Sequence, residues 1–396
     1  MFSSRFHWDL RPNRIARLLE EKRRAGIPIL DLTESNPTRA GLDYPPEILR
    51  AFEDERILRY DPQPAGAHEA RLAVARYYER RGVNVDPAQI LLTASTSEAY
   101  AYLFKLLADP GDEVLIPRPS YPLFELLAAM ESVTVRSYPL AYCGGWTIDW
   151  HALEAALTSR TRAIVLVSPN NPTGSYVKAG DLERLAALSS GRDIALICDE
   201  VFSDYAFVPD PSRVTTLAAL REGLAFSMSG LSKIAGLPQM KLGWIVVAGS
   251  AESRPRAWER LEWIADTYLS VGTPVQCAAA RLLGAGESVQ EQIRRRTRHN
   301  LEFARHAVEG TGATALAVEG GWYLTLQVPH VHTEEEWIME LLDRWNLLAQ
   351  PGFFFDFPSE AFLVVSLLTQ SAIFQQGMGR LMECIAASPF AAAHVQ

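Results

Sequence analysis

Short apolar runs alternate with longer segments in which apolar positions recur every three or four residues, from about residue 90 to residue 250. The short runs are typical of buried strands and the periodic segments of helices. Strands are predicted at 90–93, 114–116, 133–138, 163–167, 194–198, 224–228 and 242–247, and helices up to Leu107 and at 123–130, 150–157 and 181–189. Because strands that alternate with helices are joined by right-handed crossovers, we expect a mostly parallel sheet covered on both faces.

The pattern changes at both ends of the chain. A helix at 14–25 and a strand at 27–32 are predicted before the alternating region. After residue 254 the sequence predicts helices at 258–268, 275–283, 288–309, 334–345 and 374–387, with strands at 322–328 and 361–367. We therefore expect an α/β protein with a large domain at residues 45–286 and a smaller α+β domain formed by residues 1–44 and 287–396.

The composition is that of an ordinary globular protein. The 396 residues are 48% hydrophobic and 21% charged, which suffices for a large core. The formal charge is −9 and the basic residues are scattered, which argues against a nucleic-acid partner. No apolar segment has the length of a signal peptide or of a membrane span, so a cytoplasmic protein is expected.

The cysteines and histidines do not predict a metal site or a disulfide framework. Cys143, Cys198, Cys277 and Cys384 lie far apart and form no CxxC pair. We expect reduced thiols and no bound metal.

One lysine, Lys233, stands at a bend between two apolar segments. The first segment ends at Ser229-Gly230, and the second begins after Gly236 and Pro238. A lysine in such a place is costly to bury unless its charge is paired or its amine is used in chemistry. A surface lysine whose stem packs on the protein would fit the same segment. On this segment alone, both interpretations stay open.

Further polar groups follow other predicted strands. They are the Ser95-Thr96-Ser97 turn, Asn171 and Asp199. Because the carboxyl ends of parallel strands meet at one edge of a sheet, we expect these groups to lie near Lys233. The turn could hold an anion at a helix start, although N-capping alone would explain its hydroxyls. Asp199 could equally be a helix cap or an ion-pair partner.

Several short motifs follow one another in a fixed order over most of the chain. They are Tyr60-Asp61-Pro62 with Gly66, the stretch from Thr93 to Ala99, Asp109 to Val114, Pro119 to Pro122, Pro169 to Gly174, Asp199-Glu200-Val201 and Ser232-Lys233. Their order and spacing resemble those of the class I/II aminotransferases, a branch of the fold type I enzymes that use pyridoxal 5′-phosphate (PLP). The resemblance implies a fold type I α/β transferase that acts as a homodimer. It also implies a ping-pong exchange of an amino group between an amino donor, such as an amino acid, and an oxo acceptor.

The same resemblance implies roles for individual residues. Lys233 would form a Schiff base with PLP and move the substrate proton, and Asp199 would hold the proton on the pyridine ring. The other implied contacts to the cofactor are made by Ser95, Thr96, Ser97, Lys241, Tyr121, Asn171 and Tyr60, the last of which would reach the phosphate of the neighbouring subunit. Contacts to the substrate are implied for Ser35, Asn36 and Trp322.

Four positions depart from the family's pattern. Phe202 stands where the family has a tyrosine that donates to the cofactor's 3′-oxygen, and Gly230 stands in place of a serine that contacts phosphate. Lys241 replaces an arginine, so it keeps the positive charge but not the two-pronged hydrogen bonding. Val364 replaces the arginine that binds the substrate's α-carboxylate.

The valine at position 364 leaves the substrate open. Leaving a buried carboxylate unpaired costs on the order of several kcal/mol, so either the substrate or its anchor must differ. Ser35, Asn36 and the Asn171 amide are candidate anchors, whereas Arg380 is expected on a helix surface. Trp322 is expected to line the pocket, although core packing would explain it equally. A PLP-dependent lyase, decarboxylase or racemase, and a PLP-binding regulatory protein without turnover, are the alternative functions.

Overall fold

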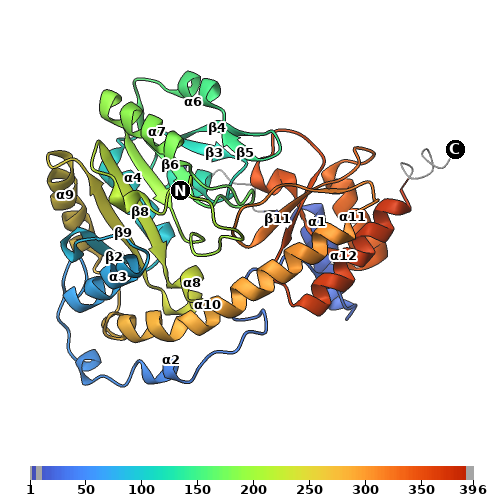
Figure 1. Ribbon diagram of the computed structural model, residues 1–396, viewed down its shortest axis with the longest axis horizontal. Coiled ribbons are helices and arrows are strands. Elements are labelled where there is room, and N and C mark those ends of the chain that lie inside the picture. Colours follow the sequence, from blue (N-terminus) through green and yellow to red (C-terminus); the bar gives the residue numbers. More distant parts are fainter. Residues whose placement is uncertain (1, 6–10, 389–396) are drawn as a thin grey trace.

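The structure, a computed structural model, describes residues 2–5 and 11–388. Figure 1 shows a large lobe built around one sheet, a smaller lobe beside it, and helix α10 running along both. Within the described residues, the strands form sheets of eight, four and two strands.

The eight-stranded sheet lies in the large lobe. Its order is β2 (Ile90–Thr93), β9 (Gly243–Gly249), β8 (Leu224–Gly230), β7 (Ala195–Asp199), β6 (Thr161–Val167), β3 (Glu113–Arg118), β4 (Thr134–Tyr142) and β5 (Trp146–Ile148). Strand β9 runs antiparallel to both neighbours and β5 runs antiparallel to β4, while the remaining pairs are parallel. The α/β fold with a mostly parallel sheet is therefore confirmed.

Helices cover both faces of this sheet because side chains alternate along each strand. In β7, Ala195 and Ile197 face one apolar cluster and Leu196 and Cys198 face another. The first cluster includes residues of α4 (Thr96–Leu107), α5 (Phe124–Met130) and α9 (Ser253–Tyr268), and the second includes residues of α6 (Trp150–Ala156) and α7 (Ala179–Arg192). A third cluster joins α3 (His68–Arg80), α8 (Leu231–Ile234) and the start of α10 to the β2 and β9 end of the sheet, near α2 (Glu47–Arg50).

Helix α10 (Thr273–Ala307) joins the two lobes as one element. The sequence predicted two helices, at 275–283 and 288–309, with the glycines at 284 and 286 between them. That prediction was wrong because Gly286 marks a close contact rather than a break. A β-carbon at Gly286 would lie 2.4 Å from the Ala235 Cβ. The predicted domain boundary at residues 286 and 287 falls inside this helix and stays a prediction.

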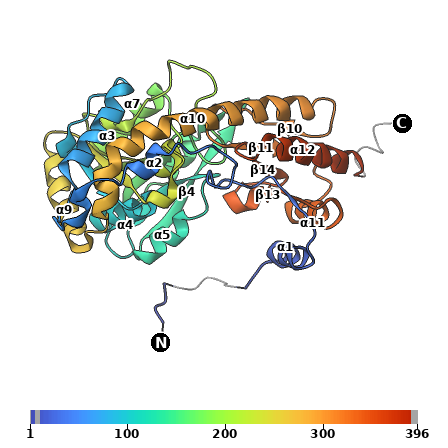
Figure 2. The same ribbon diagram turned by 90° about the horizontal axis from the view of Figure 1, so that it is seen from below.

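The smaller lobe combines the end of the chain with its beginning. Its antiparallel sheet has the order β10 (Thr314–Ala315), β11 (Tyr323–Gln327), β14 (Phe362–Ser366) and β13 (Gln350–Pro351). Strand β1 (Leu30–Asp31) pairs in parallel with β12 (Leu347–Leu348). It is shorter than the strand predicted at 27–32. Helix α1 (Arg14–Arg24) lies beside α11 (Glu334–Trp345), and α12 (Ser371–Ala386) packs on α10, as Figure 2 shows.

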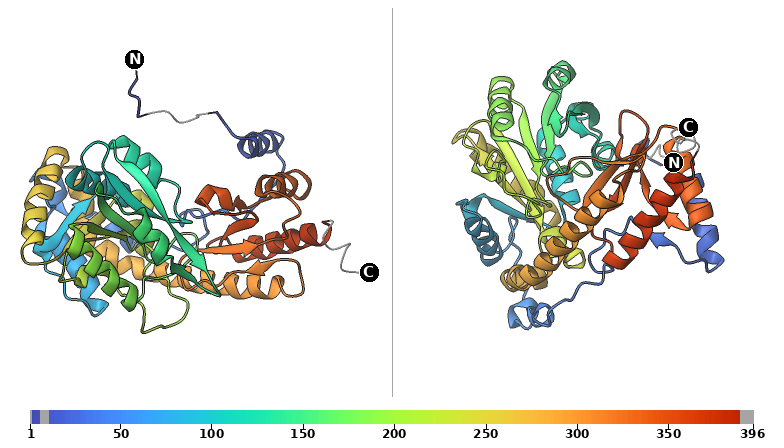
Figure 3. Two further views of the ribbon diagram at one scale, coloured as in Figure 1. Left: turned by 90° about the horizontal axis from the view of Figure 1, so that it is seen from above. Right: turned by 45° about the vertical axis from the view of Figure 1, so that its right-hand side comes forward.

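The β4–β5 hairpin links the large lobe to the smaller one. The Tyr142 hydroxyl accepts a hydrogen bond from the Ala317 N–H at 3.0 Å, and the Trp146 and Phe357 rings meet edge to face at 5.9 Å. In Figure 3 the smaller lobe, orange to red, lies at one side of the large lobe. The two lobes are therefore joined at both the hairpin and α10.

The described part of the chain contains no membrane-spanning helix, no candidate metal site and no disulfide. No helix there is both long and apolar enough to cross a lipid bilayer. No three His, Cys, Asp or Glu side chains within the same ranges are grouped so that they could hold a metal ion. The four cysteines, all inside those ranges, are free thiols.

Candidate active site

The register of the large sheet brings the predicted polar groups to one edge. Thr93 pairs with Gly243, which pairs with Gly230, so the turn after β2 lies beside the segment that leads to Lys233. In the next strand, Asp199 is the last residue of β7 and pairs with Met228. The polar groups that were predicted at strand ends therefore lie together at the carboxyl edge of the parallel strands.

Lys233 lies in the short helix α8, directly after β8. Its Nζ is 4.9 Å from the centre of the Trp322 ring and 5.6 Å from that of Phe202. Burial lowers the pKa of Lys233 to about 8, and the negative charge of Asp199 acts in the opposite direction. The Tyr205 hydroxyl donates to the Lys233 carbonyl oxygen at 2.5 Å. Near neutral pH this amine is therefore unprotonated far more often than an exposed lysine, which favours a chemical role.

Asp199 presents a partly buried carboxylate to the same site. Burial raises the pKa of Asp199 to about 6, while the Val201 N–H, which donates to Oδ1 at 3.1 Å, lowers it. The Tyr100 hydroxyl donates to Oδ2 at 3.5 Å. A buried carboxylate of this kind is stabilised by a cationic partner.

Asn171 and Tyr121 complete the centre of the site. Asn171 is buried, and its Oδ1 has no hydrogen-bond partner within the described residues. Tyr121 is 42% exposed and meets the Phe124 ring at 89°. Burial, and then the negative charge of Asp199, raise the pKa of Tyr121. Both side chains therefore offer a surface that a flat, polar ligand could occupy.

The turn after β2 is a helix N-terminus. The Ser95 hydroxyl accepts from the Glu98 N–H at 3.2 Å, so the predicted N-cap is present. Thr96 and Ser97 open α4, and the first N–H groups of a helix have no partner inside it. These groups and the helix dipole favour an anion at this point.

The residues that depart from the family's pattern each have a structural setting. A β-carbon at Gly230 would lie 2.9 Å from both the Gly243 Cα and the Leu242 carbonyl oxygen, so β8 and β9 leave no room for a side chain there. Phe202 packs edge to face on Trp322, with ring centres 5.2 Å apart. Lys241 is exposed, with a left-handed φ of 52°.

The predicted substrate residues differ in what holds them. Asn36 uses its Oδ1 to accept from the Thr38 N–H at 3.0 Å, as a turn residue does. Trp322 is fully buried, and its Nε1 has no hydrogen-bond partner in the described ranges. Arg380 donates to the Trp345 carbonyl oxygen at 2.8 Å, so this guanidinium is used within the smaller lobe.

Sequence reasoning missed Tyr323. Burial raises the pKa of this tyrosine to about 12, and hydrogen bonding from Ser35 and Asn171 acts in the opposite direction. Its hydroxyl therefore lies beside two residues that were predicted to be in the site. The alternation Tyr323, Thr325 against Leu324, Leu326 was the available signal, because it separates a polar face of this strand from an apolar one.

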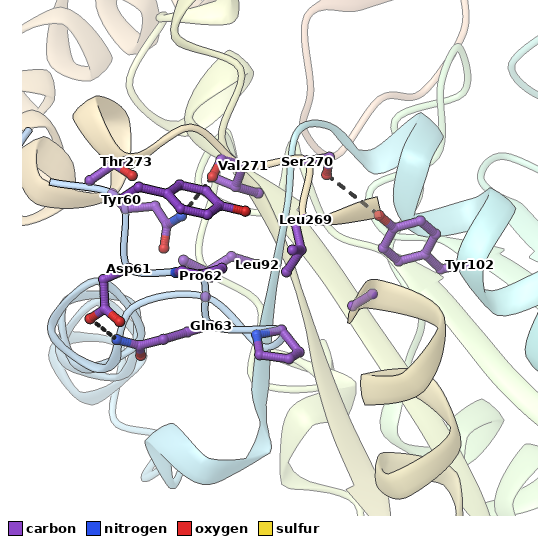
Figure 4. A pocket seen from close by; sticks show the side chains of 14 residues that line it. Tyr60, Asp61, Pro62, Gln63, Leu92, Tyr102, Leu269, Ser270, Val271 and Thr273 are labelled. Carbon is purple, nitrogen blue, oxygen red and sulfur yellow. Dashed lines mark hydrogen bonds between the residues drawn. The ribbon is translucent and has the colours of Figure 1, made fainter. Parts of the chain in front are cut away.

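Tyr60 lies in a different pocket. Its side chain is 80% exposed, and none of the residues around Lys233 lines the pocket that it enters. Figure 4 shows Tyr60 near Val271 and Thr273, with the Tyr102 hydroxyl 3.4 Å from the Ser270 Oγ on the far side.

Comparison with known proteins decides the family. The sequence profile described as Aminotransferase class I and II matches residues 27–373, which is most of the chain. The chain belongs to this family. The resemblance that the motifs indicated is therefore confirmed.

Relatives and solved structures agree with this assignment. The aminotransferase is 26% identical over 368 residues to the glutamate-pyruvate aminotransferase AlaA of Escherichia coli K12, which covers 89% of this chain and 88% of that protein. It is 32% identical over 251 residues, 61% of each chain, to a probable N-succinyldiaminopimelate aminotransferase of Mycobacterium tuberculosis. The alanine aminotransferase structure from Pyrococcus furiosus aligns with a TM-score of 0.88 at 22% identity, over 98% of this chain and 100% of that chain, which shows a shared fold.

Membership of the family brings PLP as the cofactor and the exchange of an amino group between an amino donor and an oxo acceptor as the reaction. The residues present fit this cofactor. The Asp199 carboxylate suits a protonated ring nitrogen, the buried Asn171 side chain offers an amide N–H that can donate to a ring oxygen, and the start of α4 suits a phosphate.

Proposed function

We propose that Lys233 holds the cofactor covalently and moves the proton during amino transfer. The observation that carries this proposal is an amine directly after β8 that packs beside the Trp322 and Phe202 rings and whose pKa is lowered by burial to about 8. When bound, PLP supplies an electron-withdrawing ring that stabilises negative charge on the substrate carbon. Lys233 Nζ would take the proton from that carbon and deliver it to C4′, the cofactor carbon that keeps the amino group.

The surrounding residues have roles that follow from their positions. We infer that Asp199 keeps the ring nitrogen protonated, that Tyr121 packs on the ring face and that Asn171 binds the 3′-oxygen. The phosphate would be held at the start of α4 and by a nearby cation, through Ser95, Thr96, Ser97 and Lys241. The Leu231 N–H donates to the Leu242 carbonyl oxygen at 2.9 Å, and this bond fixes the start of α8 against the segment in which Lys241 precedes β9.

We propose an amino acid as the amino donor and a 2-oxo acid as the acceptor, in a ping-pong exchange. The names of the relatives, glutamate-pyruvate and alanine aminotransferase, support this substrate class. Adding an amino donor alone to the purified holoenzyme should bleach the visible absorption band of the cofactor, with one molecule of donor consumed per active site. Adding the oxo acid should then restore the band. The measurement is an anaerobic spectral titration with a panel of donors.

The same titration separates the alternative functions. A lyase or decarboxylase would release product continuously while the visible band persisted, and a racemase would interconvert enantiomers without bleaching. A regulatory protein without turnover would bind donors with no stoichiometric return of the band. Any of these patterns across the whole donor panel would contradict amino transfer by this site.

We infer a homodimer in which Tyr60 reaches the cofactor phosphate of the partner subunit. Large apolar side chains near its pocket are exposed: Leu58 at 83%, Tyr60 at 80% and Tyr268 at 50%. Exposure of this kind supports a protein–protein contact. A role in the partner's site also accounts for a cofactor residue that lies outside the pocket of its own lysine.

Tyr60→Phe should weaken PLP binding about tenfold, because one hydrogen bond to a charged phosphate is lost. Equilibrium dialysis of the apoenzyme against PLP measures this change. Tyr142→Phe is the matched control, since it removes a hydroxyl in the β4–β5 hairpin. Unchanged affinity in Tyr60→Phe, or a monomer in sedimentation at micromolar concentration, would refute the shared site.

Two further inferences concern the whole chain. Free thiols at all four cysteines support a cytoplasmic location. The separate apolar cluster that joins α1, α11, α12 and the four-stranded sheet supports a smaller domain built from both ends of the chain.

A further inference from the structure

The face of the small sheet that carries Val364 has no cation at that position. Val364 is fully buried in β14, and its cross-strand partner in β11 is Thr325. The Thr325 Oγ1 is buried and has no hydrogen-bond partner in the described part of the chain. An arginine would be expected here from the resemblance, so a substrate group at this place meets a neutral surface.

Tyr323 lies on the same face, two residues before Thr325 in β11. Its ring meets the Phe202 ring at 90°, with centres 6.2 Å apart, and the Phe355 ring at 6.4 Å. The centre of the Phe202 ring also lies 5.6 Å from Lys233 Nζ, so Phe202 links Tyr323 to the surroundings of the reacting amine. This position is within the reach of a substrate bound at the lysine.

A clamp from β14 places the loop of Ser35 beside Tyr323. Ser366 is the cross-strand partner of Tyr323. The Ser366 Oγ donates to the Glu34 carbonyl oxygen at 2.7 Å, and the Ser366 N–H donates to the Leu32 carbonyl oxygen at 2.6 Å. The loop that contains Ser35 is therefore fixed opposite Tyr323. On the large-lobe side, the buried Asn171 Oδ1 is left without a partner among the described residues.

We propose that Tyr323 is a substrate-binding residue whose hydroxyl, together with Asn171 and Ser35, holds the oxygen-bearing group on the substrate's amine-bearing carbon, in place of an arginine at position 364. This assignment rests on the proposed function, because it takes Lys233 as the point where the substrate amine binds. The substrate anchor would thus lie on β11, at Tyr323, and not at position 364 of the neighbouring strand β14.

A neutral anchor changes what the site can distinguish. An arginine binds a carboxylate through two parallel, charge-assisted hydrogen bonds, which an uncharged group cannot match. A tyrosine hydroxyl and an amide N–H can donate to the oxygen of a carboxylate or of a carboxamide, and neither adds the positive charge by which an arginine favours the carboxylate. The site therefore accepts amino compounds with an uncharged carbonyl group beside the amine as well as ordinary amino acids.

Three probes that differ in one group test this proposal: 2-methylalanine, 2-methylalaninamide and tert-butylamine. None has a hydrogen on the amine-bearing carbon, so none can complete proton transfer. Calorimetric titration of the holoenzyme gives the dissociation constant of each. In wild type, the acid and the amide should bind within about tenfold of each other. Tyr323→Phe should weaken both about tenfold and leave tert-butylamine within about twofold.

Several outcomes would overturn the proposal. Equal weakening of all three probes would show a structural role, and no weakening of any would show no contact. A wild-type preference for the acid above about a hundredfold would show that a cation anchors it. Another outcome is a shift, in Tyr323→Phe, of the pH dependence of the absorption spectrum measured without substrate. If Phe202→Tyr in the same variant reverses that shift, the Tyr323 hydroxyl contacts the cofactor and not the substrate. Tyr142→Phe is the control for loss of a hydroxyl elsewhere.

The proposed function is tested separately, by the visible absorption spectrum of the wild type and of the Lys233→Ala variant. A visible band that disappears in Lys233→Ala supports the role of the lysine, whatever the probes show. If the band persists in that variant, the proposed function fails, while the calorimetric constants of Tyr323→Phe still report the contact with the oxygen-bearing group.

Discussion

Lys233→Ala is expected to abolish the visible band of the bound cofactor and to lower kcat for amino transfer about 10³-fold or more. The loss has two causes, because the variant lacks both the covalent attachment and the base that moves the substrate proton, and a positioned acid–base group alone contributes about 10²–10⁴-fold. The absorption spectrum and the single-turnover rate measure the two effects. Reduction with borohydride followed by peptide mapping should place the cofactor on Lys233 in the wild type.

Lys22→Ala is the matched control for this experiment. Lys22 is also buried, but its Nζ donates to the Asp343 carbonyl oxygen at 2.7 Å and to the Asn346 Oδ1 at 2.9 Å in the smaller lobe. Its loss should lower the melting temperature and leave the cofactor band intact. A reduced cofactor mapped to Lys22 or Lys241 would contradict the assignment.

Asp199→Asn should lower the rate of proton transfer about 10²–10³-fold, because a neutral amide cannot hold the ring nitrogen in its protonated form. The substitution should also act on the lysine. The negative charge of Asp199 raises the pKa of Lys233 against the larger effect of burial, which lowers it to about 8. Without that charge the lysine loses its proton at lower pH. The rate at which the apoenzyme captures PLP should therefore reach its half-maximum below about pH 8, instead of near it.

Stopped-flow absorbance across a pH series measures both quantities. Glu200→Gln is the matched control, because Glu200 is the next carboxylate in the chain and is buried, but its Oε1 accepts from the Leu217 N–H at 2.7 Å. This control should lose stability and keep its capture profile. An unchanged pH midpoint in Asp199→Asn would contradict the coupling of the two side chains.

The carboxyl edge of the sheet could be predicted from the sequence because its signals are local. Asp199 and the Ser95 turn directly follow apolar runs, and strands of known direction place their ends together. Recognition of the motif order then gave the family, which the sequence profile confirms. The individual roles of the site residues remain predictions.

The parts that were missed depend on contacts between distant segments. Tyr323 gains its place from the pairing of β11 with β14 and from the clamp of Ser366 on the loop after β1, and neither is visible in a periodic pattern. The gap predicted between the helices at 275–283 and 288–309 was wrong, and the Ala235 partner of Gly286 lies 51 positions earlier, outside any local window. Gly230 likewise suggested only a lost hydroxyl, whereas the close approach of β8 and β9 excludes a side chain.

The contact of Gly286 with Ala235 is one of the points that fix α10 to the large lobe. Ala235 follows Lys233 by two positions, so the helix touches the large lobe close to the reacting amine. From Gly286 to its end at Ala307, the helix extends about 30 Å at the usual rise of 1.5 Å per residue. A tilt of α10 by a few degrees about Gly286 would move its far end, and the smaller lobe packed there, by a few ångströms. If the smaller lobe moves to close the site over a substrate, α10 would then rotate as one rigid helix, without bending of a linker.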